Sequence, residues 1–170
     1  MNLQEFQDLN YRFLLRWDLS AVNSMTLEQY VDLGNKDTFC QWVETETRML
    51  ASIKGWSSIK FGIYKRRNSE SRPSTYSNGE QYSWLKSYKV DSAEMAFKIV
   101  KENIIKVINY AIVGDFQAID EINIPDLFKW KVAFLYSDER VIPIFQRKTL
   151  YRIAQDHGFK TGRRTRISEI

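Results

Sequence analysis

Basic and aromatic side chains stand close together in residues 56–89, and both kinds suit contact with nucleic acid. Lysine and arginine neutralise phosphates, and aromatic rings stack on unpaired or flipped bases at about 1–3 kcal/mol per base. The candidate phosphate-binding residues of this segment are Lys65, Arg66, Arg67, Arg72 and Lys86. The candidate base-stacking residues are Trp56, Tyr64, Tyr82 and Trp84.

The position of these rings depends on the face of the predicted strand 82–89 that they occupy. Alternation places Tyr82, Trp84 and Lys86 on one face and Leu85 on the other. If Leu85 faces the core, the aromatic face is open to a ligand. If the N-terminal helices cover that face, the same rings are ordinary core. The sequence leaves both arrangements open, because aromatic residues are common in strands.

A second basic segment lies near the end of the sequence. Residues 54–89 and 147–166 each carry a net charge of +6, whereas residues 1–53 carry −4 and residues 90–146 carry −3. Such segregation is typical of proteins that bind polyanions. The candidate phosphate-binding residues of the second segment are Arg147, Lys148 and Arg152.

Two other interpretations of the charge remain. Clustered surface lysines and arginines can confer solubility alone, and the acidic residues 1–53 can dock a protein partner. In that second case the chain is a protein-interaction or assembly module without nucleic-acid binding. Exposed aromatic rings near arginines favour nucleic acid, and buried rings favour the interaction module.

The inventory for enzyme chemistry is short. The sequence has one histidine, His157, and one cysteine, Cys40. Cys40 lies between Phe39 and Trp42 in a predicted helix and is expected to be a core thiol. His157 precedes Gly158 and is expected to face the helix dipole. Neither a phosphate-binding glycine loop nor an H-E-x-x-H motif occurs, so we expect no cofactor, no metal and no catalysis by this segment.

Two fragments bear on nuclease chemistry. Gly62-Ile63-Tyr64 opens like the first motif of GIY-YIG nucleases, but around Tyr76 a polar loop replaces the Tyr-x-Gly strand that should follow. Four carboxylates offer ligands for magnesium: Asp115, Asp120, Glu121 and Asp126. The lysine-bearing strand motif that completes such a site is absent, and a solvated acidic turn is the better interpretation. A metal-dependent nuclease is therefore the least favoured function.

Hydrophobic spacing predicts the helices that must position these residues. Apolar residues three to four apart predict helices within residues 1–55 and a long helix over 92–113. Ser92 is its expected N-cap and Gly114 its expected C-cap. Shorter helices are predicted at 116–122 and 149–156.

Alternating polarity predicts the sheet. An antiparallel hairpin is expected over 58–89, with a polar and basic tip at 66–81. The clearest predicted strand is Phe128–Tyr136, in which two lysines alternate with Trp130 before the run becomes apolar. A short strand at Val141–Phe145 is expected to return beside it.

These elements predict one α+β domain over residues 1–158, with helices in 1–55 and the sheet and long helix in 56–158. The expected sheet is mostly antiparallel, has about four to five strands and packs on the long helix, and a C-terminal helix follows. Residues 159–170 are expected to be a basic linker. The start of the sequence lacks signal-peptide features and no apolar run could cross a bilayer, so a cytoplasmic protein without membrane contact is expected.

Several stretches resemble the N-terminal region of bacterial McrB-like and LlaJI-type restriction proteins. The first are Phe39–Thr47, Ile53–Gly55 and Lys60–Arg66, and the later ones are Trp130–Tyr136 and Val141–Phe145. The resemblance covers roughly residues 26–158. In that family this region precedes an AAA+ GTPase module, whose motifs these 170 residues do not contain.

The resemblance implies a DNA-recognition function. It implies double-stranded DNA as the ligand, in some family members with a flipped methylated base, and a nuclease subunit that the missing module would engage. N-terminal regions of this family differ in fold, so the resemblance sets no architecture. Together with the charge pattern, it leads to the expectation of a non-catalytic DNA-binding specificity domain.

Overall fold

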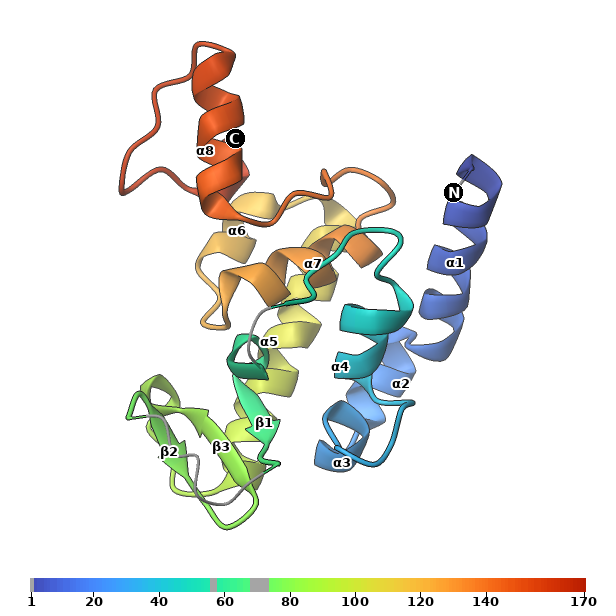
Figure 1. Ribbon diagram of the computed structural model, residues 1–170, viewed down its shortest axis with the longest axis vertical. Helices are drawn as coiled ribbons and strands as arrows, with labels where there is room; N and C mark the ends of the chain where they lie inside the picture. Colours follow the sequence, from blue (N-terminus) through green and yellow to red (C-terminus); the bar gives the residue numbers. More distant parts are fainter. Residues whose placement is uncertain (1, 56–57, 68–73) are drawn as a thin grey trace.

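The computed structural model describes residues 2–55, 58–67 and 74–170 (Figure 1). It confirms the α+β class: a small antiparallel sheet lies at one end of a mostly helical molecule. The helices are α1 (Leu3–Arg16), α2 (Leu19–Ser24), α3 (Leu27–Tyr30), α4 (Phe39–Gln41), α5 (Ala93–Val113), α6 (Phe116–Asp120), α7 (Asp126–Tyr136) and α8 (Arg147–Asp156). The strands are β1 (Ile63–Lys65), β2 (Tyr76–Asn78) and β3 (Tyr82–Leu85).

Side-chain caps define where the N-terminal helices begin. The hydroxyl of Thr26 accepts the N–H of Gln29 at the start of α3, and the hydroxyl of Thr38 accepts the N–H of Gln41 at the start of α4. α4 continues directly into a π-helical turn, Trp42–Glu46. This group of short helices and α1 lie on the right of Figure 1.

The long helix α5 is the element against which most of the others pack. Ser92 caps its start and Gly114, with a φ of 82°, ends it, as the sequence predicts. Its inward face includes Val100, Ile104 and Val107, which are fully buried. α5 contacts α7 most extensively and also packs against α2, α6, β1 and β3. It therefore joins the N-terminal helices to the sheet.

The strand predicted at Phe128–Tyr136 is wrong, because these residues form helix α7. Every one of them is buried, so the helix has no polar face and shows no 3.6-residue period in the sequence. Lys129 and Lys131 alternate with apolar residues as in a half-buried strand, but in the helix their ammonium groups bond to backbone carbonyls. Lys129 donates to the carbonyls of Asp120 and Ile122, and Lys131 donates to those of Thr47 and Ala51.

The expected sheet of four to five strands is smaller in the residues that the structure describes, where three strands pair in the order β1-β3-β2. Both pairings are antiparallel, with Ile63 opposite Trp84 and Tyr76 opposite Leu85. The strand expected at 58–65 begins with a 3₁₀ turn at Ser58–Phe61. β2 lies within the segment that was expected to be a loop, and β3 ends in a second 3₁₀ turn, Lys86–Tyr88.

The return strand expected at Val141–Phe145 is also wrong. Because α7 is a helix, no strand edge lies beside this segment, which runs as irregular chain. The turn before it places Asp138 and Glu139 at positive φ, 53° and 61°. The segment still contributes to packing, because the ring of Phe145 is buried edge-to-face against Phe134.

Aromatic residues form much of the core. Phe39 contacts the rings of Trp17, Tyr30 and Phe128, and the hydroxyl of Tyr30 donates to the carbonyl of Phe61 at 2.6 Å. These contacts hold the N-terminal helices against α7 and the segment before β1. Within the described ranges, no helix has the length and apolar character needed to cross a membrane.

Candidate nucleic-acid interface

Helix α8 forms because its apolar side chains recur on one face. Leu150 and Ala154 on that face are buried, whereas Lys148 and Arg152 on the opposite face are exposed. Gly158 follows the helix with a φ of 85°, a left-handed conformation that glycine adopts without strain. The helix therefore turns its basic side chains outward. At the top of Figure 1 it projects from the rest of the molecule.

The chain after α8 folds back onto the protein, although the sequence indicated a linker there. The guanidinium of Arg147 donates to the carbonyl of Thr165 at 2.8 Å, and the hydroxyl of Tyr151 donates to the same oxygen at 2.7 Å. Beyond this point the carboxylate of Asp120 accepts the N–H of Ile167 at 3.3 Å, and Ile167 is buried. The returning segment is thus anchored to α8 and to α6.

A tight turn in this segment presents two arginines. The N–H of Gly162 donates to the hydroxyl of Thr165 at 2.8 Å, and the N–H of Thr165 donates to the carbonyl of Gly162 at 3.0 Å. Arg163 and Arg164 occupy the two central positions and are exposed. The turn fixes their backbone while leaving their side chains in solvent.

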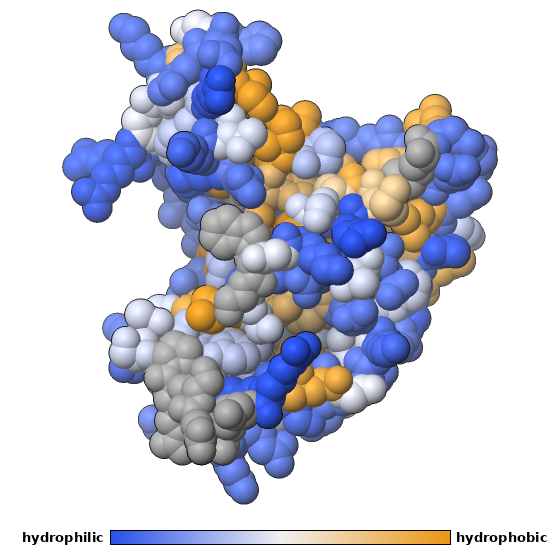
Figure 2. Space-filling model, in the orientation of Figure 1, coloured by the Kyte–Doolittle hydropathy of each residue, from blue (hydrophilic) through white to orange (hydrophobic). Residues whose placement is uncertain are grey.

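We call residues 147–166, with their net charge of +6, the C-terminal lobe. Two of its cations form ion pairs, Arg147 with Asp126 at 3.0 Å and Arg166 with Glu121 at 2.6 Å. The others are exposed and form no ion pair with any part of the chain that the structure describes: Lys148, Arg152, Lys160, Arg163 and Arg164. Figure 2 shows hydrophilic side chains extending from this lobe into solvent.

The candidate cations at the sheet end, the part of the molecule that holds β1, β2 and β3, differ from those of the lobe. Two of them bond to other groups of the protein. Lys65 forms an ion pair with Asp32 at 2.6 Å, and this contact lowers the pKa of the Asp32 carboxyl to about 2. Arg66, expected to contact phosphate, is buried and donates to the carbonyls of Gly79 and Glu80. That prediction is corrected, because this guanidinium joins the end of β1 to the turn between β2 and β3 and cannot also reach a ligand.

The remaining sheet-end candidates, Arg67, Arg72 and Lys86, do not form a basic patch within the residues that the structure describes. Arg67 and Lys86 are exposed, and Arg72 lies outside the described residues. Beside Lys65 and Tyr82 the surface is hollowed, and most of the charged residues that line the hollow are acidic: Glu28, Glu80, Asp91 and Glu94. Four carboxylates beside one paired lysine repel phosphate.

The candidate stacking residues are mostly packed. Trp84 is 4% exposed, and its indole N–H donates to the carbonyl of Val90 at 3.1 Å. Its assignment to base stacking is corrected, because a ring buried beneath the chain has no free face. Tyr64 lies edge-on to Tyr76 and Tyr82 lies near Lys65, and both Tyr64 and Tyr82 are half-buried. Trp56 lies outside the described residues.

The two basic segments do not meet on one surface of the protein. Figure 1 is drawn with the longest axis vertical, and α8 lies at its upper end while β1, β2 and β3 lie at its lower end. α6 and α7 separate them. The structure therefore brings Lys148 and Arg152 close to the arginines of the returning segment, and it keeps them apart from the sheet-end cations.

The four carboxylates that offered a magnesium site all have structural partners. Asp115 caps α6, Asp120 accepts N–H groups of the returning segment, Glu121 pairs with an arginine, and Asp126 pairs with Lys129 at 3.0 Å. Across residues 2–55, 58–67 and 74–170, no group of three His, Cys, Asp or Glu side chains is placed to hold a metal ion. These carboxylates therefore serve packing and capping.

The lone cysteine and histidine also have structural surroundings. Cys40 is buried, and desolvation raises the pKa of its thiol well above the usual value. The Nδ1 of His157 lies 2.9 Å from the carbonyl of Ile153, at the end of α8. The expected core thiol and helix-terminal histidine are both found where the sequence placed them.

No candidate site residue was predicted after Arg152. Lys160, Arg163 and Arg164 lie in a segment that was interpreted as a linker, so they contributed to the net charge but no position in the fold was predicted for them. The signal that could have found them is the Gly162–Thr165 pattern, in which glycine and a hydroxyl residue flank two arginines. Such a pattern predicts a turn with both arginines at its corners.

No family model, curated protein or solved structure matches this chain. Function therefore has to be inferred from the residues themselves.

Proposed function

We propose that this chain binds double-stranded DNA through phosphate contacts made by the C-terminal lobe, without catalysing a reaction on it. The observation that carries the proposal is that five exposed cations on one projecting lobe form no ion pair with the residues that the structure describes. Each cation that neutralises a phosphate releases condensed counterions, which favours binding. Such contacts position a protein on a duplex and carry little sequence information.

A salt titration tests the proposal. Fluorescence anisotropy with a labelled duplex of about 20 base pairs should show log affinity falling against log salt with a slope of about −4.5, as five phosphate contacts require. Between about 50 and 200 mM salt the affinity should fall by roughly two to three orders of magnitude. Absence of binding at low salt, or affinity that ignores salt, would contradict the proposal.

A pair of charge-matched variants locates the interface. R163A/R164A should weaken binding roughly tenfold at moderate salt and make the slope shallower by about 2, because two phosphate contacts are lost. The control, R67A/K86A, removes the same charge from exposed positions at the sheet end and should change the affinity by less than about twofold. Equal losses in both variants would mean that only net charge matters.

The proposal extends to a role in a McrB-like restriction system in the cytoplasm, with a nuclease partner, and this part rests on the sequence resemblance alone. Direct reading of a methylated base has less support than backbone contact, since Trp84 is buried and Tyr82 sits beside carboxylates. The same titration with methylated and unmethylated duplexes of one sequence distinguishes the two. Equal affinities identify a backbone reader.

One observation favours the second candidate, a protein-interaction module. Helix α1 buries Phe13 but leaves Leu3, Tyr11 and Leu15 more than 60% exposed. Apolar side chains in a row on an outer helix are typical of a partner contact. Sedimentation velocity of the wild type against Leu15→Glu tests this face. A concentration-dependent shift that the variant abolishes would support self-association.

A further inference from the structure

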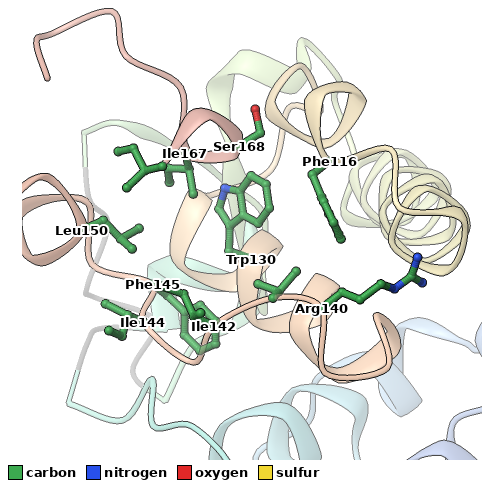
Figure 3. Close-up of a pocket in the computed structure, with 11 residues that line it drawn as sticks. Phe116, Trp130, Arg140, Ile142, Ile144, Phe145, Leu150, Ile167 and Ser168 are labelled. Atoms are coloured by element: carbon green, nitrogen blue, oxygen red, sulfur yellow. The ribbon is translucent and has the colours of Figure 1, made fainter. Parts of the chain in front are cut away.

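A small cavity lies where the C-terminal lobe meets the rest of the protein (Figure 3). Phe116 of α6 and Trp130 of α7 form one part of its wall, and Leu150 of α8 and Ile167 form another. Ile142 and Phe145, from the irregular chain after α7, complete most of the lining. The cavity is therefore bounded by body and lobe together.

The size and lining of the cavity suit a small apolar molecule. Its volume is about 180 Å³, and aliphatic and aromatic side chains make up most of its surface. Apolar cavities of about 150 Å³ in proteins stay dry and bind benzene. A single aromatic ring with a short substituent fits this space.

Two polar groups in the wall lack partners. Trp130 is 3% exposed, and its indole Nε1 has no hydrogen-bond acceptor within the described ranges. The buried hydroxyl of Ser168 is in the same state. In Figure 3 the indole nitrogen lies on the edge of the Trp130 ring that faces Ile167 and Leu150. A buried N–H without an acceptor is unfavourable, and a ligand that supplies one removes that penalty.

Among the described residues of the lining, Arg140 alone has a charged side chain, and that side chain is already engaged. The guanidinium of Arg140 donates to the carbonyls of Ala111 and Ile112 at the end of α5, at 3.0 and 2.6 Å. A third bond goes to the carbonyl of Ser137 at 2.7 Å. Figure 3 shows this side chain extending away from Trp130. The cavity thus offers no free charge to a ligand, which favours a neutral one.

We propose that this cavity is a binding site for a small neutral aromatic molecule that carries a hydrogen-bond acceptor. The ring occupies the apolar space between Phe116, Leu150 and Phe145, and the acceptor receives the indole N–H of Trp130. The site is independent of DNA binding, because none of the exposed cations of the lobe lines it. A ligand there contacts α7 and α8 at once and holds the lobe against the body.

Two probes of similar shape test the role of the acceptor. Acetophenone has a carbonyl acceptor, and ethylbenzene lacks one. In titrations followed by ¹H–¹⁵N NMR, the wild type should bind acetophenone roughly three- to tenfold more tightly than ethylbenzene, since one buried hydrogen bond separates them. The Trp130→Phe variant keeps a ring and removes the donor, so it should bind both probes equally.

A matched control is available in Trp17, whose indole nitrogen is also buried and without an acceptor in the described residues but which is not part of the lining of this cavity. Trp17→Phe should leave the acetophenone preference unchanged. In the wild type, the indole proton signal that Trp130→Phe removes should move downfield with acetophenone and much less with ethylbenzene. The indole shift is measured on the wild type, and Trp130→Phe is needed only to assign the signal.

Three outcomes would overturn the proposal. Neither probe binds at millimolar concentration, the preference for acetophenone survives in Trp130→Phe, or the probes shift signals remote from Phe116, Leu150 and Ile167. If Trp130→Phe does not fold, the indole shift of the wild type decides alone, since probes that leave every indole signal in place exclude a bond to Trp130.

Discussion

The two basic regions of this protein carry the same net charge in the sequence but differ after folding in which of their candidate cations the protein itself engages. At the sheet end, Lys65 is paired with Asp32 and Arg66 is buried against backbone carbonyls. In the C-terminal lobe, Arg163 and Arg164 stand at the corner of a turn without partners among the described residues. The net charge of a sequence segment therefore overestimates how many of its cations can bind a ligand, because some of them bond to carbonyls or carboxylates of the folded protein.

Removing Arg66 should have the largest effect on stability. Its guanidinium donates to the carbonyls of Gly79 and Glu80 in a partly exposed turn, and Arg66→Ala leaves both carbonyls without that charged donor. We expect a loss of about 2–4 kcal/mol in the free energy of unfolding, measured by urea denaturation. Arg67→Ala, one residue on and exposed, is the control and should cost less than about 0.5 kcal/mol. Equal losses of stability in Arg66→Ala and Arg67→Ala would show that the bonds of Arg66 to these carbonyls do not stabilise the fold.

Lys131 extends the comparison to a cation whose hydrogen-bond acceptors in the described residues are backbone carbonyls, those of Thr47 and Ala51. It is fully buried in α7, its ammonium lies 5.3 Å from the ring of Phe134, and burial lowers its pKa from 10.5 to about 7. Below pH 7 both folded and unfolded chains hold the proton. Between pH 7 and 9 only the unfolded chain holds it, so the free energy of unfolding should rise by about 2 kcal/mol.

Lys131→Met tests this pH dependence, because the substitution removes the titrating group and keeps an apolar chain of similar length. Urea denaturation at several pH values should give a nearly flat profile for the variant. A rise equal to that of the wild type would assign the effect to another group.

The Lys65–Asp32 pair should have a smaller effect. Because Lys65 lowers the pKa of Asp32 from 3.8 to about 2, the pair stabilises the fold above pH 4 and loses that contribution as the pH falls towards 2. Lys65→Met should cost about 1 kcal/mol at pH 7, since both side chains remain partly in solvent. The same variant should unfold with a weaker acid dependence, and an unchanged acid midpoint would contradict the pairing.

The smallest effect is expected in the lobe. Arg164→Ala removes a side chain without partners in the described part of the chain, so the melting temperature should stay within about 1–2 °C of the wild type. Differential scanning calorimetry measures it. A large loss of stability would mean that this arginine is engaged like Arg66.

Helices with one polar face could be predicted from the sequence. α5 and α8 show the apolar period and the glycines that end them, and both are found close to the predicted bounds. α7 could not be predicted, because a helix buried on all sides has no period, and Lys129 and Lys131 resemble strand alternation. The partners that would reveal it, the carbonyls of Thr47 and Ala51, are remote in sequence.

The candidate interface divides in the same way. Lys148 and Arg152 were predicted from the basic charge of residues 147–166, and the structure places both on the exposed face of α8, opposite Leu150. The errors at Arg66 and Trp84 come from contacts that no local pattern shows, to the carbonyls of Glu80 and Val90. Burial of a long polar side chain depends on which acceptors tertiary folding brings near, and a single sequence does not contain that information.

The distribution of lysine and arginine also governs how a protease would meet this protein. Trypsin cuts after these residues, yet Lys60, Lys129 and Lys131 are buried, whereas Arg163 and Arg164 form an exposed corner. Native digestion should therefore trim the returning segment before it reaches the core. Because trypsin cleaves on the carboxyl side of each residue, a protein cut at this corner would keep its helices and also Lys148, Arg152 and Lys160, so the first cut should release a short peptide and leave most of the basic surface of the lobe in place.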